Sequence, residues 1–446
     1  AGSVFLILAN LPIPAITKFY LTDTGQIIQK WLSYPVGVTF DLIAVITCLG
    51  IAYRLSESYK LDGISGAILG LVSFLLVTPF VINFTHEKFG QLTAAGIPTS
   101  LTGSSGLFVA IIMAILSTEI FNFIVKKDLV IKMPDMVPPA VSKSFAALIP
   151  GFFIISAALI IRIIFEVTPF GSIHNVVSVL LTRPLTYIGG SLFGVMGITT
   201  LIHLLWTCGL HGANIVFGIV DPALYVLMDQ NRQAFMAGQA LPNVATKQFF
   251  DVFQSMGGSG TTLSLAVMLV FLAKSKQLKE IGKLSLGPGL FNINEPILFG
   301  LPVVMNPLLI IPFIIAPLVT VVVTYISMKT GLVARPTGIA IPWTTPPFIS
   351  GYLVTGGKLS GVVIQIVNFF LTGIIYYPFF KIWDRKKLQE EKRLIFSTSL
   401  ANPTKAKIIG DMDSVPYEYY DTVLELINNF ISGKNASGEL KRLKSN

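Results

Sequence analysis

The chain has 446 residues, of which 53% are hydrophobic and only 12% charged, and its mean hydropathy is +0.73. This composition lies far from the roughly 25% charged content of soluble domains and excludes a water-soluble globular protein. The formal net charge of +9 does not indicate nucleic-acid binding, because the basic residues gather in a few short connections and not on an amphipathic face.

The apolar residues fall into about ten blocks, each close to the length of about 20 residues that a helix needs to cross a hydrocarbon layer. No cleaved signal peptide is recognisable. The first apolar stretch, Val4–Ile16, is too short to span, so the sequence is expected to begin inside its first helix. Four continuous membrane-spanning helices are predicted next, over Val36–Tyr53, Ile64–Phe84, Gly106–Val125 and Phe145–Phe165.

The apolar stretches of the second half are repeatedly broken by glycine, proline and polar residues. The breaks are Cys208–Gly212, Met256–Thr262, Gly287–Pro296 and Pro342–Pro347. Interrupted backbone is tolerated at membrane depth only where protein or a wet cavity satisfies its polar groups, and transporters bind substrates at such breaks. The pattern favours a substrate-binding region, with surface loops as the alternative.

Three parts follow from this change of pattern. Residues 1–182 are predicted to form a transmembrane scaffold, residues 183–392 a transport region with broken helices, and residues 393–446 a polar tail. Apolar residues of the tail recur at the spacing of a short amphipathic helix; they are Tyr417, Tyr420, Leu424, Ile427 and Phe430. The pattern assigns the tail no function.

Three clusters of basic residues orient the chain. By the positive-inside rule all three are expected to face the cytoplasm, as is the C-terminus. The clusters are Lys126, Lys127, Lys132 and Lys143; then Lys274, Lys276, Lys279 and Lys283; then Lys381, Arg385, Lys386, Lys387, Lys392 and Arg393. The two cysteines, Cys48 and Cys208, lie in apolar blocks, where burial is expected and a disulfide is not.

Glu295 is the leading candidate for chemistry, because it is a carboxylate in an otherwise apolar stretch. Ionisable residues at membrane depth usually face a cavity and serve a ligand or a proton path. Pro296 biases Glu295 away from helical geometry. The alternatives are an ion pair with a basic side chain or a place at the start of a helix. Asn292 and Asn294 offer amides for a polyhydroxylated ligand, although turn formation also explains them.

His211 is the second candidate, because it lies in a break with Asn214 close behind it and glycine on both sides. A histidine can hydrogen-bond a hydroxyl or accept its proton, and simple satisfaction by a neighbouring carbonyl is the alternative. His203, Cys208 and His211 lack the spacing of a metal site, so no metal is expected.

Trp343 offers an aromatic face beside the hydroxyls of Thr344 and Thr345, between two prolines that prevent a helix. That combination suits a sugar, and an aromatic residue at the membrane interface is the alternative. Of the other charged residues near spans, Arg162 and Glu166 are expected to pair at i, i+4. Asp41 and Glu119 have no obvious partners and are candidates to line a cavity.

Two motifs together, Gly257-Gly258-Ser259-Gly260-Thr261-Thr262-Leu263 and Asn292-Ile293-Asn294-Glu295-Pro296-Ile297, carry a family resemblance over most of residues 1–390. The chain resembles the membrane IIC component of bacterial sugar phosphotransferase systems, in the lactose, cellobiose and diacetylchitobiose branch. Within that branch it most resembles diacetylchitobiose permeases.

The resemblance implies an all-α polytopic protein of the bacterial inner membrane, with about ten transmembrane helices and two re-entrant hairpins in its second half. It implies a homodimer formed by the first half and a disaccharide carried by an elevator-like movement. Glu295 would hold the C6 hydroxyl with His211 beside it, and Asn294 and Trp343 would line the pocket. The phosphoryl donor would be a cysteine of a separate soluble IIB protein, so this chain alone would be inactive, and no cofactor is implied.

A proton-coupled secondary sugar transporter is the rival reading, because a membrane carboxylate such as Glu295 or Asp41 can also relay protons. A hydrolytic membrane enzyme lacks any paired-carboxylate or nucleophile signature in this sequence.

Overall fold

The computed structural model describes residues 5, 8–9, 14–86, 90–134, 136–303, 306–400 and 425. Among these residues the chain divides into two compact units. Unit 1 draws on Ala1–Leu205, Leu210–Gln254 and Thr320–Asn368, and unit 2 on Trp206–Gly209, Ser255–Val319 and Phe369–Asn446. The functional division predicted at residues 182 and 392 stays a prediction.

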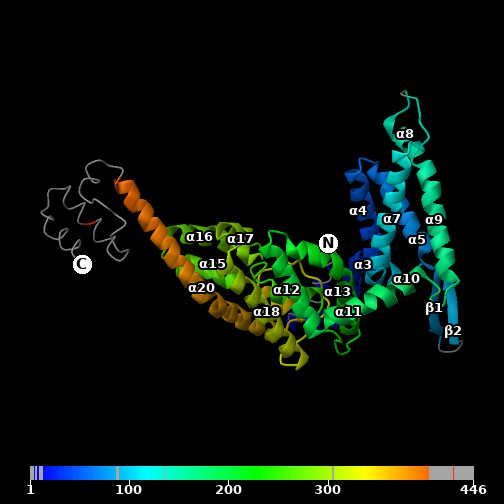
Figure 1. Cartoon of the computed structure of the whole chain (residues 1–446). Coiled ribbons are helices and arrows are strands. Elements are labelled where there is room, and N and C mark those ends of the chain that lie inside the picture. Colours follow the sequence, from blue (N-terminus) through cyan, green and yellow to red (C-terminus); the bar gives the residue numbers. More distant parts are fainter. Residues whose placement is uncertain are drawn as a thin grey trace. The chain divides into compact units, whose positions relative to one another are not determined.

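The described elements are nearly all helices (Figure 1). Up to residue 207 they are α2 (Pro14–Tyr20), α3 (Asp23–Phe40), α4 (Ile43–Ser58), α5 (Gly63–Val77), β1 (Val81–His86), β2 (Gly90–Ala95), α6 (Thr99–Thr102), η1 (Ser104–Gly106), α7 (Leu107–Lys126), α8 (Pro139–Ala146), α9 (Leu148–Glu166), α10 (Ile173–Val177), the π-helical turn η2 (Ser178–Thr182), α11 (Arg183–Gly190) and α12 (Leu192–Thr207). The remainder are α13 (Gly212–Met236), α14 (Lys247–Phe249), the π-helical turn η3 (Phe250–Gln254), α15 (Leu263–Phe271), α16 (Lys276–Leu290), α17 (Glu295–Gly300), α18 (Pro307–Lys329), α19 (Ile349–Val354) and α20 (Leu359–Leu400).

Five helical stretches of the described chain are long and apolar enough to cross a membrane; they are Ser104–Lys126, Val141–Glu166, Gly212–Met236, Pro307–Lys329 and Leu359–Arg393. The number rises to seven if two bent pairs of helices are each counted as one span. The first pair is α3 and α4, with a bend of 42° between them. The second is the helical stretch Ile173–Gly190 and α12, with a bend of 92°. The predicted class, a helical polytopic membrane protein, is confirmed. The count of about ten crossings stays a prediction.

Unit 1 contains a bundle of α4, α5, α7 and α9, whose core is built from small residues (Figure 1). Alanines at positions 44 and 52 of α4 and at 110 and 114 of α7 are fully buried there with Cys48. A Cβ atom at Gly66 would lie 1.9 Å from Ser56 Oγ, and one at Gly70 would lie 2.6 Å from Ala52 Cβ. The backbones of α4 and α5 therefore approach as closely as small residues allow, which is how membrane helices pack.

A two-stranded antiparallel sheet is the one departure from the all-α expectation in the described residues. The helix predicted over Ile64–Phe84 ends at Val77, and β1 pairs with β2 so that Val81 faces Ala95. Thr78 precedes Pro79, which disfavours helical geometry, and its ψ of 130° is extended. The apolar sequence thus continues beyond Pro79, although the helix ends before this proline. The five tail residues predicted to form an amphipathic helix lie outside the described residues.

Candidate functional site

Unit 2 contains a tight glycine-rich loop immediately before α15. Gly257, Gly258 and Gly260 have φ angles of 77°, 87° and 81°, a region that side chains with a Cβ rarely adopt. Thr261 follows at φ 53°. A Cβ atom at Gly258 would lie 2.5 Å from the Asn294 side chain. Glycine is therefore required here both by the backbone conformation and by the close approach of a neighbouring segment.

That neighbouring segment is the break between α16 and α17. Asn292 has a φ of 63°, a left-handed conformation that asparagine tolerates better than most residues. Pro296 then occupies the first turn of α17, where its missing N–H costs nothing. The sequence thus ends one helix and starts the next within four residues, leaving Phe291 to Asn294 between the two helices.

Buried amides join the two segments. The backbone N–H of Gly257 donates to Asn292 Oδ1 at 2.9 Å, and Asn294 Nδ2 donates to the backbone oxygen of Ser259 and to Thr262 Oγ1, the latter at 3.0 Å. Thr262 Oγ1 in turn donates to the Gly257 oxygen at 2.6 Å. The two motifs singled out in the sequence therefore form one hydrogen-bonded structure, and the amides of both asparagines are used to build it.

Glu295 projects from this structure at the start of α17. Its side chain is exposed, and no described residue pairs with it by an ion pair or a hydrogen bond. Glu295 is the first residue of α17, so the alternative of a place at the start of a helix is what the described residues show. The alternative of an ion pair with a basic side chain is not what the described residues show. The carboxylate is free to accept a hydroxyl.

Tyr376 and Thr372 of α20 brace the glycine-rich loop within unit 2. Tyr376 is fully buried and its hydroxyl donates to the Gly260 oxygen at 2.7 Å, while Thr372 Oγ1 lies 2.9 Å from Ser264 Oγ. Sequence reasoning missed both residues. An isolated tyrosine or threonine in a long apolar helix gives no signal that distinguishes it from lipid-facing neighbours.

His211 lies in unit 1, at the start of α13, and its side chain is exposed. Its Nδ1 atom accepts from the backbone N–H of Asn214 at 3.2 Å, so His211 caps the helix. With Nδ1 accepting, a neutral imidazole carries its proton on Nε2. The Asn214 side chain is exposed beside it.

Trp343 also lies in unit 1, in the non-helical segment before α19. Its side chain is 53% exposed. Thr345 closes the turn that carries it, since both its backbone N–H and its hydroxyl donate to the Pro342 oxygen, at 2.9 Å and 2.7 Å. Glu295, Asn292 and Asn294 thus belong to unit 2, and His211, Asn214 and Trp343 to unit 1.

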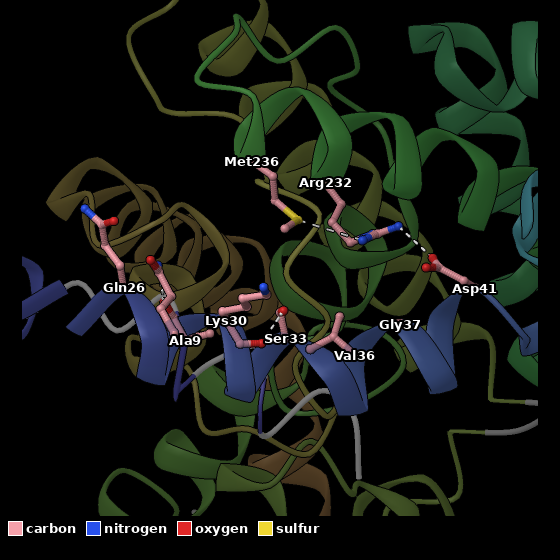
Figure 2. Close-up of a pocket in the computed structure, with 10 residues that line it drawn as sticks. Ala9, Gln26, Lys30, Ser33, Val36, Gly37, Asp41, Arg232 and Met236 are labelled. Atoms are coloured by element: carbon pink, nitrogen blue, oxygen red, sulfur yellow. Dashed lines mark hydrogen bonds and ion pairs between the residues drawn. The ribbon is translucent and has the colours of Figure 1, made fainter. Parts of the chain in front are cut away.

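The other intramembrane charges have structural partners. Asp41 Oδ1 lies 3.2 Å from Arg232 Nη2, which also contacts Asp229 Oδ1 at 2.7 Å. Asp41 and Arg232 line a cavity of about 480 Å³ in unit 1, together with Gln26, Lys30 and Ser33 (Figure 2). The expectation that Asp41 lines a cavity is therefore met, and its partner is a residue far away in the sequence.

Three further charged residues also have partners. Glu119 accepts from the Tyr59 hydroxyl at 2.5 Å, and Arg162 pairs with Glu166 at 3.5 Å as the spacing predicted. Cys208 is exposed, which corrects the expectation that both cysteines are buried. Among the described residues no three His, Cys, Asp or Glu side chains gather as metal ligands would.

The connection between α15 and α16 gathers two of the basic clusters at one end of unit 2. Asp384 Oδ1 accepts from the backbone N–H groups of Lys274 and Ser275 at 3.0 Å and 2.9 Å, and Glu391 accepts from the N–H groups of Lys276 and Gln277 at 3.0 Å and 2.7 Å. These carboxylates bind backbone amides. Lys283 pairs with Glu280, and no described residue forms an ion pair with the exposed ammonium groups of Lys274, Lys276 and Lys279. The end of the unit is strongly basic.

Several helices that could cross a membrane, with broken segments joined by buried amides, define the chain as a helical membrane permease. The family model of the phosphotransferase system, EIIC, matches residues 1–317. The lichenan permease IIC component of Bacillus subtilis (strain 168) is 54% identical over 395 residues, which cover 88% of this chain and 87% of that protein. The cellobiose-specific EIIC component of Geobacillus stearothermophilus is 54% identical over 395 residues, covering 88% of each chain.

A solved structure gives the same answer. The crystal structure of the transporter ChbC, the IIC component of the N,N'-diacetylchitobiose-specific phosphotransferase system, matches with a TM-score of 0.84 at 54% identity, covering 88% of this chain and 91% of that one. This chain belongs to the EIIC family of the phosphotransferase system. It is therefore a multi-pass membrane component of a sugar phosphotransferase system, whose partners are a sugar and a IIB protein.

Proposed function

We propose that this chain binds a β-linked disaccharide of the cellobiose or diacetylchitobiose type, carries it inward and presents its C6 hydroxyl to the phosphocysteine of a soluble IIB protein. The relatives are named for lichenan, cellobiose and diacetylchitobiose, and these names support this substrate class. The main observation behind the proposal is the exposed carboxylate of Glu295. It lies three residues after Asn292, which is hydrogen-bonded to Gly257 of the glycine-rich loop.

The chemical step needs one acceptor for the sugar hydroxyl. Phosphoryl transfer depends mostly on positioning and charge, and a carboxylate can orient a hydroxyl and take its proton. In the proposed step the C6 oxygen forms a bond to phosphorus while the sulfur–phosphorus bond of the IIB phosphocysteine breaks. The hydroxyl proton passes to Glu295, and the cysteine leaves as a thiolate. Without the IIB protein, no such step occurs.

Within unit 1, His211 and Trp343 are the proposed sugar-binding residues. Because His211 Nδ1 is occupied by a backbone N–H, its Nε2 is the atom that can donate to a sugar oxygen. Trp343 offers an exposed ring for stacking against the sugar, beside the Thr344 hydroxyl. Asn292 and Asn294 act mainly by holding Glu295 in place, because their amides bond to the glycine-rich loop.

The basic connection between α15 and α16 is the proposed landing surface for the IIB protein on the cytoplasmic side. Exposed ammonium groups attract a phosphorylated, acidic surface and accelerate its encounter. The same assignment places the end of α20 in the cytoplasm, because Asp384 and Glu391 of α20 bond to that connection.

The proposal also includes an elevator-like movement of the sugar-binding region and a homodimer formed by residues 1–182. α9 supports a dimer because it exposes a broad apolar surface, including Phe152, Ile160 and Ile163. Lipid covers such a surface equally well, so cross-linking between cysteines introduced on α9 in native membranes is the measurement that tests the dimer.

Glu295→Gln in proteoliposomes is the direct test. The variant keeps the size of the side chain and loses its basicity, so formation of sugar phosphate with phosphorylated IIB should fall by about a hundredfold or more. Glu57→Gln, an exposed glutamate of α4 outside the proposed landing surface, is the matched control and should leave the rate unchanged. Wild-type turnover by Glu295→Gln would refute the assigned role.

The rival function is a proton-coupled secondary transporter, favoured only by the presence of intramembrane carboxylates. Asp41 is already paired with Arg232, which leaves Glu295 as the carboxylate such a mechanism would use. The chemical form of the internal sugar separates the two functions. Sugar phosphate inside the vesicles supports the proposal, and unmodified sugar that accumulates and is released by an uncoupler supports the rival.

A further inference from the structure

Two buried glutamines hold the ends of the segment that carries Trp343. Gln248, 3% exposed, accepts from the backbone N–H of Ile341 and donates to its oxygen, both at 3.4 Å. Gln365 of α20 is fully buried and bonds to the other end of the segment. All of these residues belong to unit 1. The segment that contains the exposed Trp343 is therefore hydrogen-bonded to a buried glutamine at each end.

Gln365 uses the whole hydrogen-bonding capacity of its amide. Its Oε1 accepts from the backbone N–H groups of Phe348 at 2.7 Å and Gly351 at 3.0 Å. Its Nε2 donates to the Val252 oxygen at 2.9 Å and to Ser350 Oγ at 3.0 Å. A primary amide has two donors and two lone pairs, and all four are engaged here. A buried amide with this many partners specifies one geometry for the segments it joins.

The backbone that Gln365 holds is conformationally demanding. Phe348 has a φ of 73°, a left-handed conformation that is rare for a bulky aromatic residue. Such a conformation persists only when the surroundings over-determine it. The hydrogen bond from its N–H to Gln365 supplies that constraint. The chain thereby turns directly into α19, and Gln365 also accepts the N–H of Gly351 in the first turn of that helix.

The contact leaves no room for adjustment. A Cβ atom at Gly351 would lie 2.3 Å from Gln365 Oε1 and 2.5 Å from the Gly361 oxygen. The backbone of α19 therefore rests on α20 at van der Waals distance, with the glutamine amide between them. A change in the Gln365 side chain must move the start of α19, and with it the segment that ends there.

We propose that Gln365 is a positioning residue for sugar recognition: by fixing Phe348 and Gly351 it sets the orientation of Trp343 without touching the sugar. The inference rests on the proposed function, since it takes Trp343 to contact the disaccharide. It adds a residue that sequence patterns do not reveal, because Gln365 lies in the second turn of the long helix α20 among mainly apolar residues.

Gln365→Met tests the proposal, because methionine has a similar size and forms none of the four hydrogen bonds. The matched control is Asn368→Leu, one turn further along α20. Asn368 is equally buried, and its amide donates to Thr324 Oγ1 on α18 at 2.8 Å instead of to the Trp343 segment. Both variants lose a buried amide from one helix, so general destabilisation is common to them.

The first measurement is the dissociation constant of cellobiose and of diacetylchitobiose for the purified full chain without IIB. Gln365→Met should raise the constant of the sugar that the wild type binds by roughly tenfold, and Asn368→Leu should leave it within about twofold. Equal weakening by both variants, or wild-type affinity in Gln365→Met, would overturn the proposal.

The second measurement needs no sugar. In a chain carrying Cys48→Ala, Cys208→Ser and Thr344→Cys, the rate of maleimide labelling at position 344 reports the conformation of the segment. Gln365→Met should change that rate several-fold and Asn368→Leu should not. An unchanged rate in Gln365→Met overturns the positioning role by itself. Failure of the wild-type chain to bind either disaccharide instead overturns the proposed substrate, which keeps the two claims separable.

Discussion

The side-chain oxygen of Asn292 accepts the backbone N–H of Gly257 at 2.9 Å, across 35 positions of the sequence. This single bond joins the glycine-rich loop to the break that presents Glu295. Since Asn292 has a left-handed φ and Gly257 does too, both partners adopt conformations that few other residues would accept. The motif spacing in the sequence therefore reflects one structure, in which the loop supports the carboxylate.

Gly258→Ala is expected to disrupt this support. The added methyl group would lie 2.5 Å from the Asn294 side chain and would also face an unfavourable φ of 87°. Formation of sugar phosphate should fall by about tenfold or more, with a loss of stability of about 1–3 kcal/mol. Gly287→Ala on α16, where an added Cβ would have no neighbour within 4 Å, is the control and should leave sugar-phosphate formation unchanged. Comparable activity of the two variants would contradict the packing argument.

Asn292 should tolerate aspartate better than leucine. Asn292→Asp keeps an acceptor for the Gly257 N–H and a short side chain that visits left-handed conformations. Asn292→Leu loses the acceptor, leaves a buried N–H unpaired and should cost about 2–3 kcal/mol of unfolding free energy. Thermal unfolding in detergent, followed alongside sugar binding, measures both effects. The reverse order of stability would show that the hydrogen bond does not hold the two segments together.

His211 carries two roles that substitutions can separate. His211→Asn retains a side-chain acceptor for the Asn214 N–H and should keep the cap on α13, while His211→Ala should lower stability by about 1 kcal/mol. Both variants lose Nε2, so both should weaken disaccharide binding. Titration calorimetry paired with thermal unfolding checks the prediction. Wild-type binding by the stable asparagine variant would restrict His211 to its capping role.

The basic end of unit 2 should control the encounter with IIB. Lys276 and Lys279 are exposed, and Lys276→Glu with Lys279→Glu should raise the apparent KM for phosphorylated IIB by several-fold at low salt. The effect should shrink as ionic strength rises, because screening removes it. Lys329→Glu with Lys358→Glu, at two exposed lysines of unit 1, controls for the change of net charge. A salt-independent effect, or an equal effect of this control, would argue against this landing surface.

Asp62 should matter for stability and not for transport. It caps α5 by accepting from Ser65 N at 2.9 Å, and it pairs with Lys143 at 3.3 Å. Burial opposes ionisation, but these hydrogen bonds and the Lys143 charge outweigh it and hold the pKa of the Asp62 carboxyl below its usual value.

A lowered pKa means that the ionised carboxylate stabilises the fold at neutral pH, and this contribution is lost as acid protonates it below about pH 4. Asp62→Ala should cost about 1 kcal/mol at pH 7 and less in acid, and Asp62→Ser should restore most of it. Unfolding temperatures of the three chains across pH provide the check. A penalty that grows in acid would mean that the sign assigned to the pKa is wrong.

In the first half of the chain, local sequence patterns predicted some helices correctly and misplaced the end of another. The spans predicted over Gly106–Val125 and Phe145–Phe165 correspond closely to α7 and α9, because length and apolarity decide whether a helix can cross a bilayer. The span predicted over Ile64–Phe84 was too long by seven residues, because an apolar run carries on through Pro79 where helical backbone does not.

In the second half of the chain, the sequence revealed some residues of the candidate site and not others. Sequence alone selected Asn292, Asn294 and Glu295, since polar residues beside a proline in an apolar stretch are unusual. It left open whether Glu295 pairs with a basic side chain or starts a helix, because that depends on the direction in which α17 leaves the break. Gln365 and Tyr376 were not detectable, because their partners lie more than a hundred positions away or across a turn that has no sequence signature.

The sequence by itself determined that this protein resides in a membrane, that its helices break in the second half, and which family it belongs to. Those properties follow from composition, from the length of apolar runs and from short motifs, all of which are local. Only the tertiary structure decided that Gly257 and Asn292 bond, that Asp41 is neutralised by Arg232, and that Gln365 supports the Trp343 segment. Hydrogen bonds between distant segments depend on how the helices pack, and that information is not contained in any single stretch of the chain.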